Sequence, residues 1–355
     1  MSDVKISIQN LYKIFGKNPR TAMEHVNNGV GKQELLNKYG HVLGLQNINL
    51  DLHERSIEVI MGLSGSGKST LIRHINRLLD PTTGSVVIDG EDILKMSAAG
   101  LRELRQNKVS MVFQKFALMP HHTILQNVEF GLDLRADVAA SEKRERAEYW
   151  LQRVGLKGVE AQYPGHLSGG MQQRVGLARA LATDADILLM DEAFSALDPL
   201  IRTDMQDMLL ELQAELNKTI IFITHDLDEA LRIGDRIAIL NDGALVQQGS
   251  AQQILLHPQD DYVRRFVADV NRVKVLRVNA IMTPVTDLTE EVDDSRPMTV
   301  KSGQRVEHLM NKVVLTNPSS IWVLDSDGQR TGYISRAALA ETIGRDEDAS
   351  WNSAA

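Results

Sequence analysis

Strand-like alternation and short apolar runs divide the first 270 residues into a regular series of predicted elements. Residues 4–15 alternate as a strand does, and alternation resumes at 45–52 after a polar stretch, 17–41, that has helical spacing. Apolar runs typical of strands buried in a parallel sheet occur at 56–61, 109–113, 187–190 and 219–224. Helical spacing recurs at 70–79, 141–154, 171–182 and 201–216. The series predicts an α/β domain with a parallel sheet, ending in a hairpin at 235–249.

The pattern changes near Val270, where we place a domain boundary. Residues 271–297 hold a basic run and then an acidic one, and we interpret them as a solvated linker rather than core. A small α+β domain is predicted over 298–345. Its elements are a strand at 298–300, a helix at 303–314, strands at 320–325 and 331–335, and a helix at 336–343. We expect the last residues, 346–355, to form a frayed tail.

Composition narrows the class of protein. The chain has 355 residues, of which 43% are hydrophobic and 24% charged, as in an ordinary globular protein. Its net charge of −8 argues against nucleic acid as a partner, because nucleic-acid binding favours a basic surface. The chain has no cysteine, which excludes disulfides and thiolate metal sites. The sequence shows neither a membrane-spanning apolar run nor a signal segment, so we expect a cytoplasmic protein.

The segment after the strand at 56–61 has the pattern of a phosphate-binding loop. Residues 62–70 read Gly-Leu-Ser-Gly-Ser-Gly-Lys-Ser-Thr and lie between a predicted strand and a predicted helix. The glycines let backbone N–H groups approach phosphate oxygens, and the helix adds the positive end of its dipole. Lys68 is placed to bridge the β- and γ-phosphates, and Ser69 to ligate Mg²⁺. A chance Gly-rich turn is the alternative, and the full match in this context argues against it.

Two acidic residues end the apolar strand at 187–190. Asp191 lies at the carboxyl end of the predicted sheet, where Mg²⁺ held by Ser69 would lie, so we expect Asp191 to bind the ion directly or through water. Glu192 follows it and is a candidate general base toward the attacking water. The alternative is that both are ordinary acids in the first turn of a helix, where negative charge is favoured.

A histidine and a glutamine follow two further strands. His225 ends the apolar strand 220–224 on the same predicted edge as Asp191, which favours a contact with the γ-phosphate over a structural role. Gln114 ends the strand at 109–113 and is expected to reach Mg²⁺ or the attacking water. A solvated polar side chain is the alternative for Gln114.

A second Gly-rich turn enters a helix at residues 167–173, which read Leu-Ser-Gly-Gly-Met-Gln-Gln. Such a helix N-terminus offers the Ser168 hydroxyl and the Gly170 N–H to a phosphate group. It lies far along the sequence from the first loop. The ordered set of motifs indicates that the chain binds ATP between two copies of itself and hydrolyses it.

Together these motifs resemble the ATPase subunits of ABC transporters, over residues 4 to about 265. The resemblance implies an ABC ATPase domain of the P-loop NTPase fold at 1–270, with a parallel sheet core, an antiparallel β subdomain and a helical subdomain. It also implies an aromatic side chain stacked on adenine, for which Phe15 is the candidate and Tyr12 the fallback. The ATP-binding set is then Phe15, Gly62, Ser64, Gly65, Ser66, Gly67, Lys68, Ser69 and Thr70. The catalytic set is Glu192, His225 and Gln114, and the Mg²⁺ set is Ser69, Gln114 and Asp191.

A head-to-tail dimer is a further implication of the resemblance. In such a dimer the signature residues of one chain contact the ATP bound by the other; here they are Ser168, Gly169, Gly170 and Gln172. The D-loop at 195–198 would place Asp198 at the seam. ATP would close the dimer and hydrolysis would release it, a population shift by a ligand that prefers the closed state.

Longer stretches resemble one branch of this family, the glycine betaine/proline importers. The opening NLYKIFG, the helical insertion 17–44 and the segment MVFQKFALMPH carry this similarity. It implies quaternary amine substrates such as glycine betaine, proline betaine, choline and carnitine. It also implies a permease docked near Phe116–Gly131, a substrate-binding protein reached through that permease, and a peripheral location on the cytoplasmic face of the inner membrane. The region 298–345 resembles a single CBS unit, so pairing of such units would have to occur between two chains.

Three other functions remain open on the sequence alone. The chain could energise import of a different small polar solute. It could be a soluble ABC ATPase acting on nucleic acid or ribosomes, although tandem ATPase domains and basic arms are not visible. Its C-terminal region could instead be a regulatory module that senses a ligand.

Overall fold

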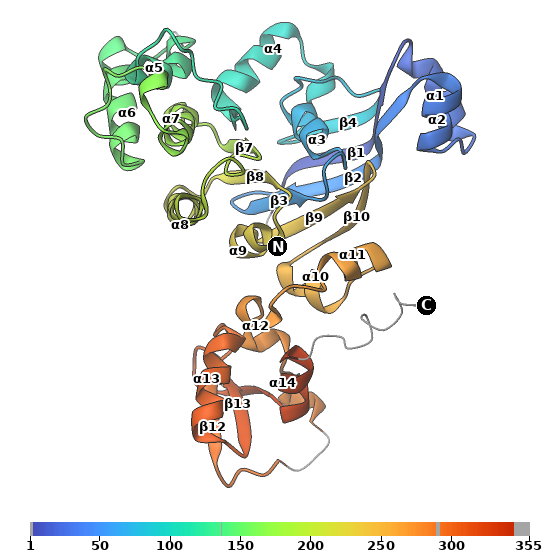
Figure 1. Cartoon of the computed structure of the whole chain (residues 1–355), viewed down its shortest axis with the longest axis vertical. Coiled ribbons are helices and arrows are strands. Elements are labelled where there is room, and N and C mark those ends of the chain that lie inside the picture. Colours follow the sequence, from blue (N-terminus) through green and yellow to red (C-terminus); the bar gives the residue numbers. More distant parts are fainter. Residues whose placement is uncertain (1–2, 136, 289–291, 344–355) are drawn as a thin grey trace. The chain divides into compact units, whose positions relative to one another are not determined.

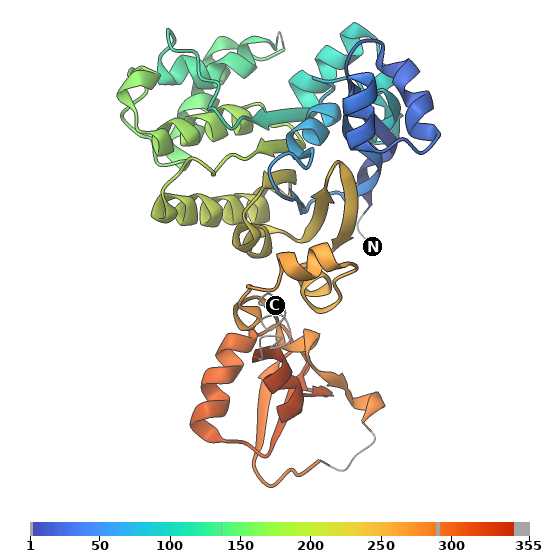
Figure 2. The same cartoon turned by 45° about the vertical axis from the view of Figure 1, so that its right-hand side comes forward.

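The computed structural model describes residues 3–135, 137–288 and 292–343 (Figure 1; Figure 2). These residues fall into two compact units, divided between Gln248 and Gly249. This division lies before residue 271, where we placed the boundary, because helices α10 (Ala251–Leu256) and α11 (Asp261–Phe266) group with the second unit. The predicted frayed tail, 346–355, lies outside the described residues.

A six-stranded sheet forms the centre of the first unit, in the order β10-β9-β3-β8-β7-β6. Its strands are β3 (Ile57–Met61), β6 (Val109–Val112), β7 (Ile187–Asp191), β8 (Thr219–Thr224), β9 (Arg236–Asn241) and β10 (Ala244–Gly249). The strands from β9 through β3, β8 and β7 to β6 pair in parallel. Strands β3, β7 and β8 are apolar and buried along nearly their whole length, as expected of strands covered on both faces.

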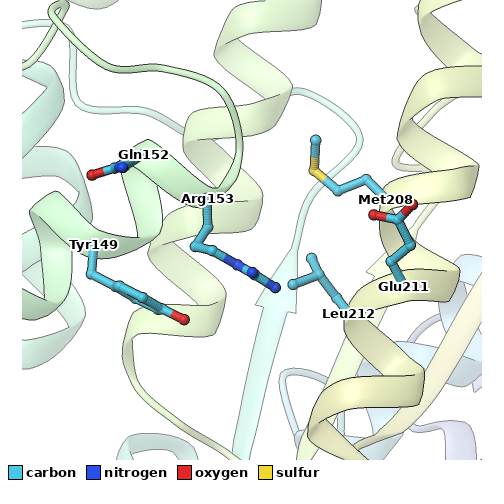
Figure 3. A pocket seen from close by; sticks show the side chains of 6 residues that line it. All are labelled: Tyr149, Gln152, Arg153, Met208, Glu211 and Leu212. Carbon is cyan, nitrogen blue, oxygen red and sulfur yellow. The ribbon is translucent and has the colours of Figure 1, made fainter.

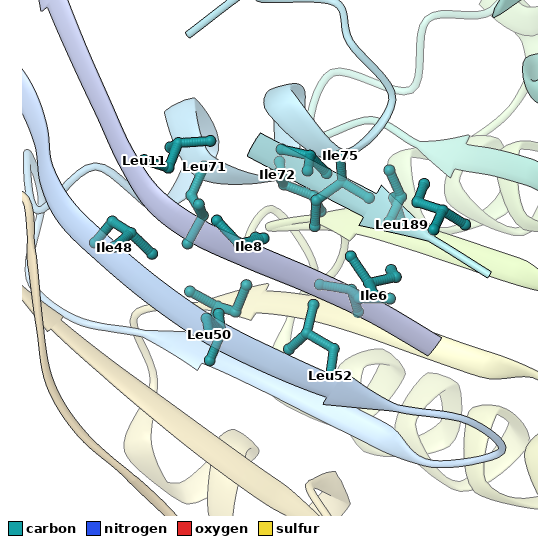
Figure 4. Close-up of a cluster of buried hydrophobic side chains, with 14 of the residues drawn as sticks. Ile6, Ile8, Leu11, Ile48, Leu50, Leu52, Leu71, Ile72, Ile75 and Leu189 are labelled. Atoms are coloured by element: carbon teal, nitrogen blue, oxygen red, sulfur yellow. The ribbon is translucent and has the colours of Figure 1, made fainter. Parts of the chain in front are cut away.

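A second sheet has the order β2-β1-β4-β5, and its pairs are antiparallel. Its strands are β1 (Val4–Phe15), β2 (Val42–His53), β4 (Thr83–Ile88) and β5 (Glu91–Asp92). Alternate residues of β1 and β2, such as Ile6, Ile8 and Leu50, point into one cluster of buried side chains (Figure 4). Helix α3 (Lys68–Ile75) adds Leu71 and Ile72 to the same cluster, so the helix that follows the phosphate-binding loop is anchored in the main core.

The insertion between β1 and β2 forms two short helices, α1 (Pro19–Asn27) and α2 (Lys32–Tyr39). They enclose a small core of their own, made of Ile14, Ala22, Met23, Val26, Leu35 and Leu43. Lys32 of α2 forms an ion pair with Asp242 in the turn between β9 and β10. The insertion is therefore packed against its own strands rather than extended into solvent.

The remaining helices of the first unit include a closely packed group of three, α5 (Ile124–Asp133), α6 (Ala140–Arg153) and α7 (Gly169–Ala182) (Figure 1). Helices α8 (Pro199–Leu216) and α9 (Leu227–Ile233) follow β7 and β8. Helix α4 (Ala98–Glu103) leads into a π-helical turn at Leu104–Lys108. Short 3-10 turns lie at Ile93–Lys95 and Pro164–His166.

The second unit contains a four-stranded sheet in the order β11-β14-β13-β12. The strands are β11 (Thr283–Pro284), β12 (Pro297–Lys301), β13 (Ser320–Leu324) and β14 (Arg330–Tyr333). Besides α10 and α11, the unit has helices α12 (Arg272–Val275), α13 (Val306–Thr316) and α14 (Arg336–Ile343), and 3-10 turns lie at Val278–Ala280 and Val285–Asp287. The interpretation of 271–297 as solvated is wrong for Leu276 and Val278, which are fully buried. Their backbone bonds to Val306 and Gln304 at the start of α13, so this segment is part of the unit's core.

Candidate functional site

The predicted site residues meet at the carboxyl ends of four neighbouring parallel strands. Met61 of β3 pairs with Thr224 of β8, and Ile223 pairs with Asp191 of β7. Val112 of β6 pairs with Met190, so Gln114 leaves the sheet at the same edge. The strand register therefore brings the phosphate-binding loop, Asp191, Glu192, Gln114 and His225 together from distant parts of the sequence.

The phosphate-binding loop requires glycine at defined points. Gly62 has φ +149°, and a Cβ atom there would overlap the carbonyl oxygen of Leu240. Gly67 has φ +100°, and a Cβ atom would lie 2.8 Å from the carbonyl oxygen of Gly44. The loop is thus pressed against two other segments at positions where no side chain fits. Within the described structure the buried hydroxyl of Ser66 has no hydrogen-bond partner, a donor that a phosphate oxygen would satisfy.

Lys68 is the buried cation of this loop, with only 4% of its side chain exposed. Its Nζ donates to the carbonyl oxygens of Gly62 at 2.8 Å and Leu63 at 3.0 Å. Burial lowers the pKa of Lys68, while the nearby carboxylates of Glu192 and Asp191 act to raise it. A buried ammonium group at the start of a helix that follows a Gly-rich loop is suited to hold a polyanion.

Asp191 and Ser69 form a pair of oxygen ligands beside the loop. The Ser69 hydroxyl donates to Asp191 Oδ1 at 2.7 Å, and Asp191 is 2% exposed. Oxygen donors of this kind suit Mg²⁺, which keeps several waters and binds through one or two protein oxygens plus phosphates. Arg73 Nη2 lies 3.4 Å from Asp191 Oδ2. The sequence motifs do not single out Arg73, although its spacing of four from Ser69 puts both residues on one face of α3.

Glu192 is the centre of the group. Gln114 Nε2 donates to Glu192 Oε2 at 2.9 Å, His225 Nδ1 lies 3.8 Å from the same oxygen, and Lys68 Nζ lies 4.0 Å from Oε1. The backbone of Glu192 has φ +47°, a conformation that is uncommon for a residue with a side chain. Its N–H bonds to Ile223 O at 3.1 Å, which fixes this turn to β8. The carboxylate is therefore held where three predicted site residues converge.

Phe15 ends β1, and 39% of the residue is exposed. The ring lies over Gly44, where a Cβ atom would come within 2.6 Å of it, and Gly44 is also the residue that approaches Gly67 of the phosphate-binding loop. Tyr12 instead packs against the small core of the insertion. The exposed ring close to the loop is thus that of Phe15.

Residues of the second Gly-rich turn line an open pocket of about 650 Å³ together with the D-loop. Ser168 caps α7 by accepting from Met171 N at 3.3 Å, and Asp198 caps α8 by accepting from Ile201 N at 3.1 Å. Ser168, Gly169, Gly170 and Asp198 lie on this pocket. Gln172 is used internally, since its Nε2 donates to the carbonyl oxygens of Pro164 and Leu167. None of the residues that line this pocket belongs to the phosphate-binding loop.

A different pocket, of about 340 Å³, lies between α6 and α8 (Figure 3). Arg153 extends from α6 toward Leu212 and Glu211 of α8, and forms an ion pair with Glu215. No predicted site residue lines this pocket, which therefore plays no part in the site described here.

The fold and this site define a class. A match to the family model for the ABC transporter covers residues 45–195, and the motifs meet at one sheet edge. The protein is therefore an ATP-binding, ATP-hydrolysing subunit of an ABC transporter. Within that class the chain belongs to the ATP-binding proteins of the glycine betaine transport branch, because its relatives in that branch match it over most of its length.

Three relatives illustrate the similarity. The glycine betaine transport ATP-binding protein OpuAA of Bacillus subtilis is 56% identical over 93% of this chain and 76% of its own length. The glycine betaine/proline betaine protein ProV of Salmonella typhimurium is 56% identical over 78% of this chain and 69% of its own. The trimethylamine N-oxide protein TmoW of Pelagibacter ubique is 42% identical over 97% of this chain and 98% of its own.

Solved structures resemble about two thirds of the chain. A dimeric structure of the bacterial ABC transporter cassette MJ0796 matches with a TM-score of 0.60 and 34% identity, over 69% of this chain and 98% of that one. A post-hydrolysis dimer of the same cassette, bound to ADP and Pi, matches with a TM-score of 0.59 and 33% identity over the same shares. Among the described residues, none of the helices combines the length and the hydrophobicity that a membrane span requires.

Proposed function

We propose that this chain energises the import of a small solute with a fully methylated nitrogen, glycine betaine above all. OpuAA and ProV, both 56% identical, carry glycine betaine in their names. A second candidate solute is trimethylamine N-oxide, which TmoW carries in its name and which shares the methylated nitrogen. The higher sequence identity to OpuAA and ProV favours glycine betaine. The near-equal length of this chain and TmoW favours trimethylamine N-oxide.

Hydrolysis is assigned to Glu192 as general base. The carrying observation is that its carboxylate is held by Gln114 at 2.9 Å and lies 3.8 Å from His225. A base must be positioned before it can take a proton from water, and these contacts position it. Lys68 would bridge the β- and γ-phosphates, and His225 would contact the γ-phosphate. Mg²⁺, held by Ser69 and Asp191 with Gln114 nearby, would neutralise charge on the phosphate oxygens.

The ATP site is composite in this proposal. The phosphate-binding loop and Phe15 of one chain hold the nucleotide, and Ser168, Gly169 and Gly170 of a second chain close it. The open pocket shared by the signature and D-loop residues supports this, because it leaves the N-terminus of α7 accessible. Gln172 is the weakest member of the signature set, since its amide already donates to two carbonyl oxygens.

The permease is proposed to dock on residues 116–131. Here Phe116 and Ala117 have φ near +46° and +48°, and Arg179 of α7 donates to both of their carbonyl oxygens at 2.9 and 2.7 Å. Asn127 is buried and ties the segment together through the carbonyl oxygens of Met119 and His122. The loop that leads from Gln114 to α5 is held to α7 by Arg179, and such a loop is suited to relay permease movement to the site. We place the protein on the cytoplasmic face of the membrane accordingly.

The second unit is proposed to contain a single CBS-like unit from β12 to α14. The order β12, α13, β13, β14, α14 supports this, because the sequence pattern predicts a strand, a helix, two strands and a helix here. Strands β12 and β13 pair in parallel, and β13 and β14 pair antiparallel. We assign it pairing with the same unit of a second chain, with ligand binding as the alternative.

Replacement of Glu192 by Gln tests the hydrolytic assignment. The amide keeps the size and the contact with Gln114 but is no base, so turnover should fall by about 10²–10⁴-fold while ATP binding persists. ATP should then trap a dimer, visible by light scattering. Near-normal hydrolysis by this variant would remove Glu192 from the mechanism.

Transport of the solute is tested in the native cell. Deletion of the chain should abolish uptake of labelled glycine betaine, and the wild-type chain but not Glu192→Gln should restore it. Labelled choline and trimethylamine N-oxide serve as the competing solutes. Loss of trimethylamine N-oxide uptake alone would assign the chain to the second candidate.

A further inference from the structure

Arg202, in the first turn of α8, contacts two loops at once. Its Nη2 donates to the carbonyl oxygen of Leu197 in the D-loop at 3.2 Å. Its Nη1 lies 3.2 Å from Asp226 Oδ2, and Asp226 directly follows His225. One planar guanidinium group therefore connects the D-loop with the loop that carries the histidine.

Asp226 fixes the turn in which His225 stands. Its Oδ1 accepts from Glu229 N at 3.1 Å and caps α9, while its own N–H donates to Thr224 Oγ1 at 2.9 Å. His225 lies between these two anchored points with its own side chain 56% exposed. A shift of Asp226 would therefore move His225, because the peptide between them is short and fixed at both ends.

A second contact stiffens the same connection. Gln206, one turn further along α8, donates to Glu229 Oε1 at 3.1 Å, and both side chains are buried. Burial raises the pKa of the Glu229 carboxyl. Two contacts thus join helix α8 to the start of α9, one from Arg202 and one from Gln206. The contact from Arg202 is the one nearer to the D-loop.

We propose that Arg202 is a positioning residue that transmits the position of the D-loop to His225. The D-loop residues Ala196 and Asp198 are exposed and line the pocket of the signature turn, the face assigned above to the second chain. Contact with the second chain sets the position of the D-loop. Arg202 then passes this change in position to Asp226 and so to His225, which faces the γ-phosphate. The inference rests on the proposed composite site and on the proposed role of His225.

The chain offers a matched control on the same two helices. Arg232 of α9 and Asp207 of α8 form an ion pair at 2.7 Å, with side chains 38% and 54% exposed, against 28% and 35% for Arg202 and Asp226. This pair joins α8 to α9 beyond the first turn, away from the D-loop. A purely structural contribution of an α8–α9 ion pair should therefore appear equally in Arg202→Gln and Arg232→Gln.

The experiment compares four variants of the full chain: Arg202→Gln, Asp226→Asn, the double variant and Arg232→Gln. Asparagine caps a helix as well as aspartate does. Asp226→Asn therefore removes the negative charge but keeps the N-cap of α9. We expect both single variants to lower kcat about tenfold while KM for ATP stays within about twofold. The double variant should be no slower than the slower single one, because both remove the same contact. Arg232→Gln should match the wild type.

Several results would overturn the inference. One is a kcat for Arg202→Gln equal to that of Arg232→Gln, and another is additive losses in the double variant. A fall in ATP affinity or melting temperature that accounts for the lost activity would assign Arg202 a structural role instead. Asp226→Asn keeps the test decisive if Arg202→Gln does not fold. Measured beside Glu192→Gln, the series separates the two claims. If Glu192→Gln is inactive but Arg202→Gln is normal, only the positioning role fails.

Discussion

His74 makes the free energy of unfolding depend on pH, and the size of this effect follows from the surroundings of its side chain. It lies in α3 with no exposed surface, and its Nδ1 faces the carbonyl oxygen of Thr70 at 2.6 Å. Nδ1 therefore carries the hydrogen, and a second proton would have to enter at the buried Nε2. Burial lowers the pKa of His74 from 6.5 to about 4, against a smaller opposing effect of the Thr70 carbonyl.

The sign and magnitude of this contribution are fixed by linkage. Between pH 6.5 and about 4 the unfolded chain binds a proton at His74 that the folded chain does not, so stability falls as the pH falls. The shift corresponds to about 3 kcal/mol over that window, at about 1.4 kcal/mol for each pH unit. The contribution is fully present above pH 6.5 and is lost as the pH falls to about 4.

The assay is urea denaturation of the wild type, His74→Leu and Ile75→Val at about pH 7 and about pH 4.5. The carboxylates titrate alike in all three, so the difference in pH dependence isolates His74. His74→Leu should lose about 2–3 kcal/mol less than the wild type on acidification. Ile75→Val should lose about 0.5–1.5 kcal/mol at both pH values and keep the wild-type slope. An unchanged slope in His74→Leu would refute the reasoning.

Two further predictions concern the nucleotide site. Gly62→Ala should abolish ATP binding, because its Cβ would overlap the Leu240 carbonyl, whereas Gly65→Ala meets no atom within 4 Å and should only weaken it; titration with a fluorescent ATP analogue compares the two. Phe15→Ala should weaken ATP and ADP binding alike, by about tenfold, the scale of a base stacked on an aromatic ring. Calorimetry on Phe15→Ala and Tyr12→Ala would contradict this assignment if only the tyrosine variant lost affinity.

The elements around the site are predictable from sequence because the apolar pattern and the geometry of a parallel sheet agree there. Short apolar runs bounded by polar residues or glycine predict β3, β7 and β8 with ends correct to one residue. Parallel strands share an edge, so residues that follow them must converge, and Asp191, Glu192, Gln114 and His225 do. The roles of these residues are not visible in the fold and stay predictions.

Other features depend on contacts that local pattern does not contain. Leu276 and Val278 lie in a segment of mostly basic and polar residues, and only the backbone bonds to the start of α13 show that they are core. Arg202 is one of many arginines in the sequence; its two partners are separated from each other by about thirty positions, and the D-loop and α9 meet only in the folded chain. Contacts between residues that are distant in the sequence cannot be predicted from local sequence pattern.

The central claim is that each ATP lies between Lys68 of one chain and Ser168 of another. It is tested most directly by mixing Lys68→Ala chains with Ser168→Arg chains, each inactive alone, and measuring ATP hydrolysis. A composite site leaves one intact site in every mixed dimer, so the equal mixture should recover about a quarter of wild-type activity if sites work independently. If each chain carried its whole site, neither partner would have an intact one, and an inactive mixture of chains that demonstrably pair would contradict the account.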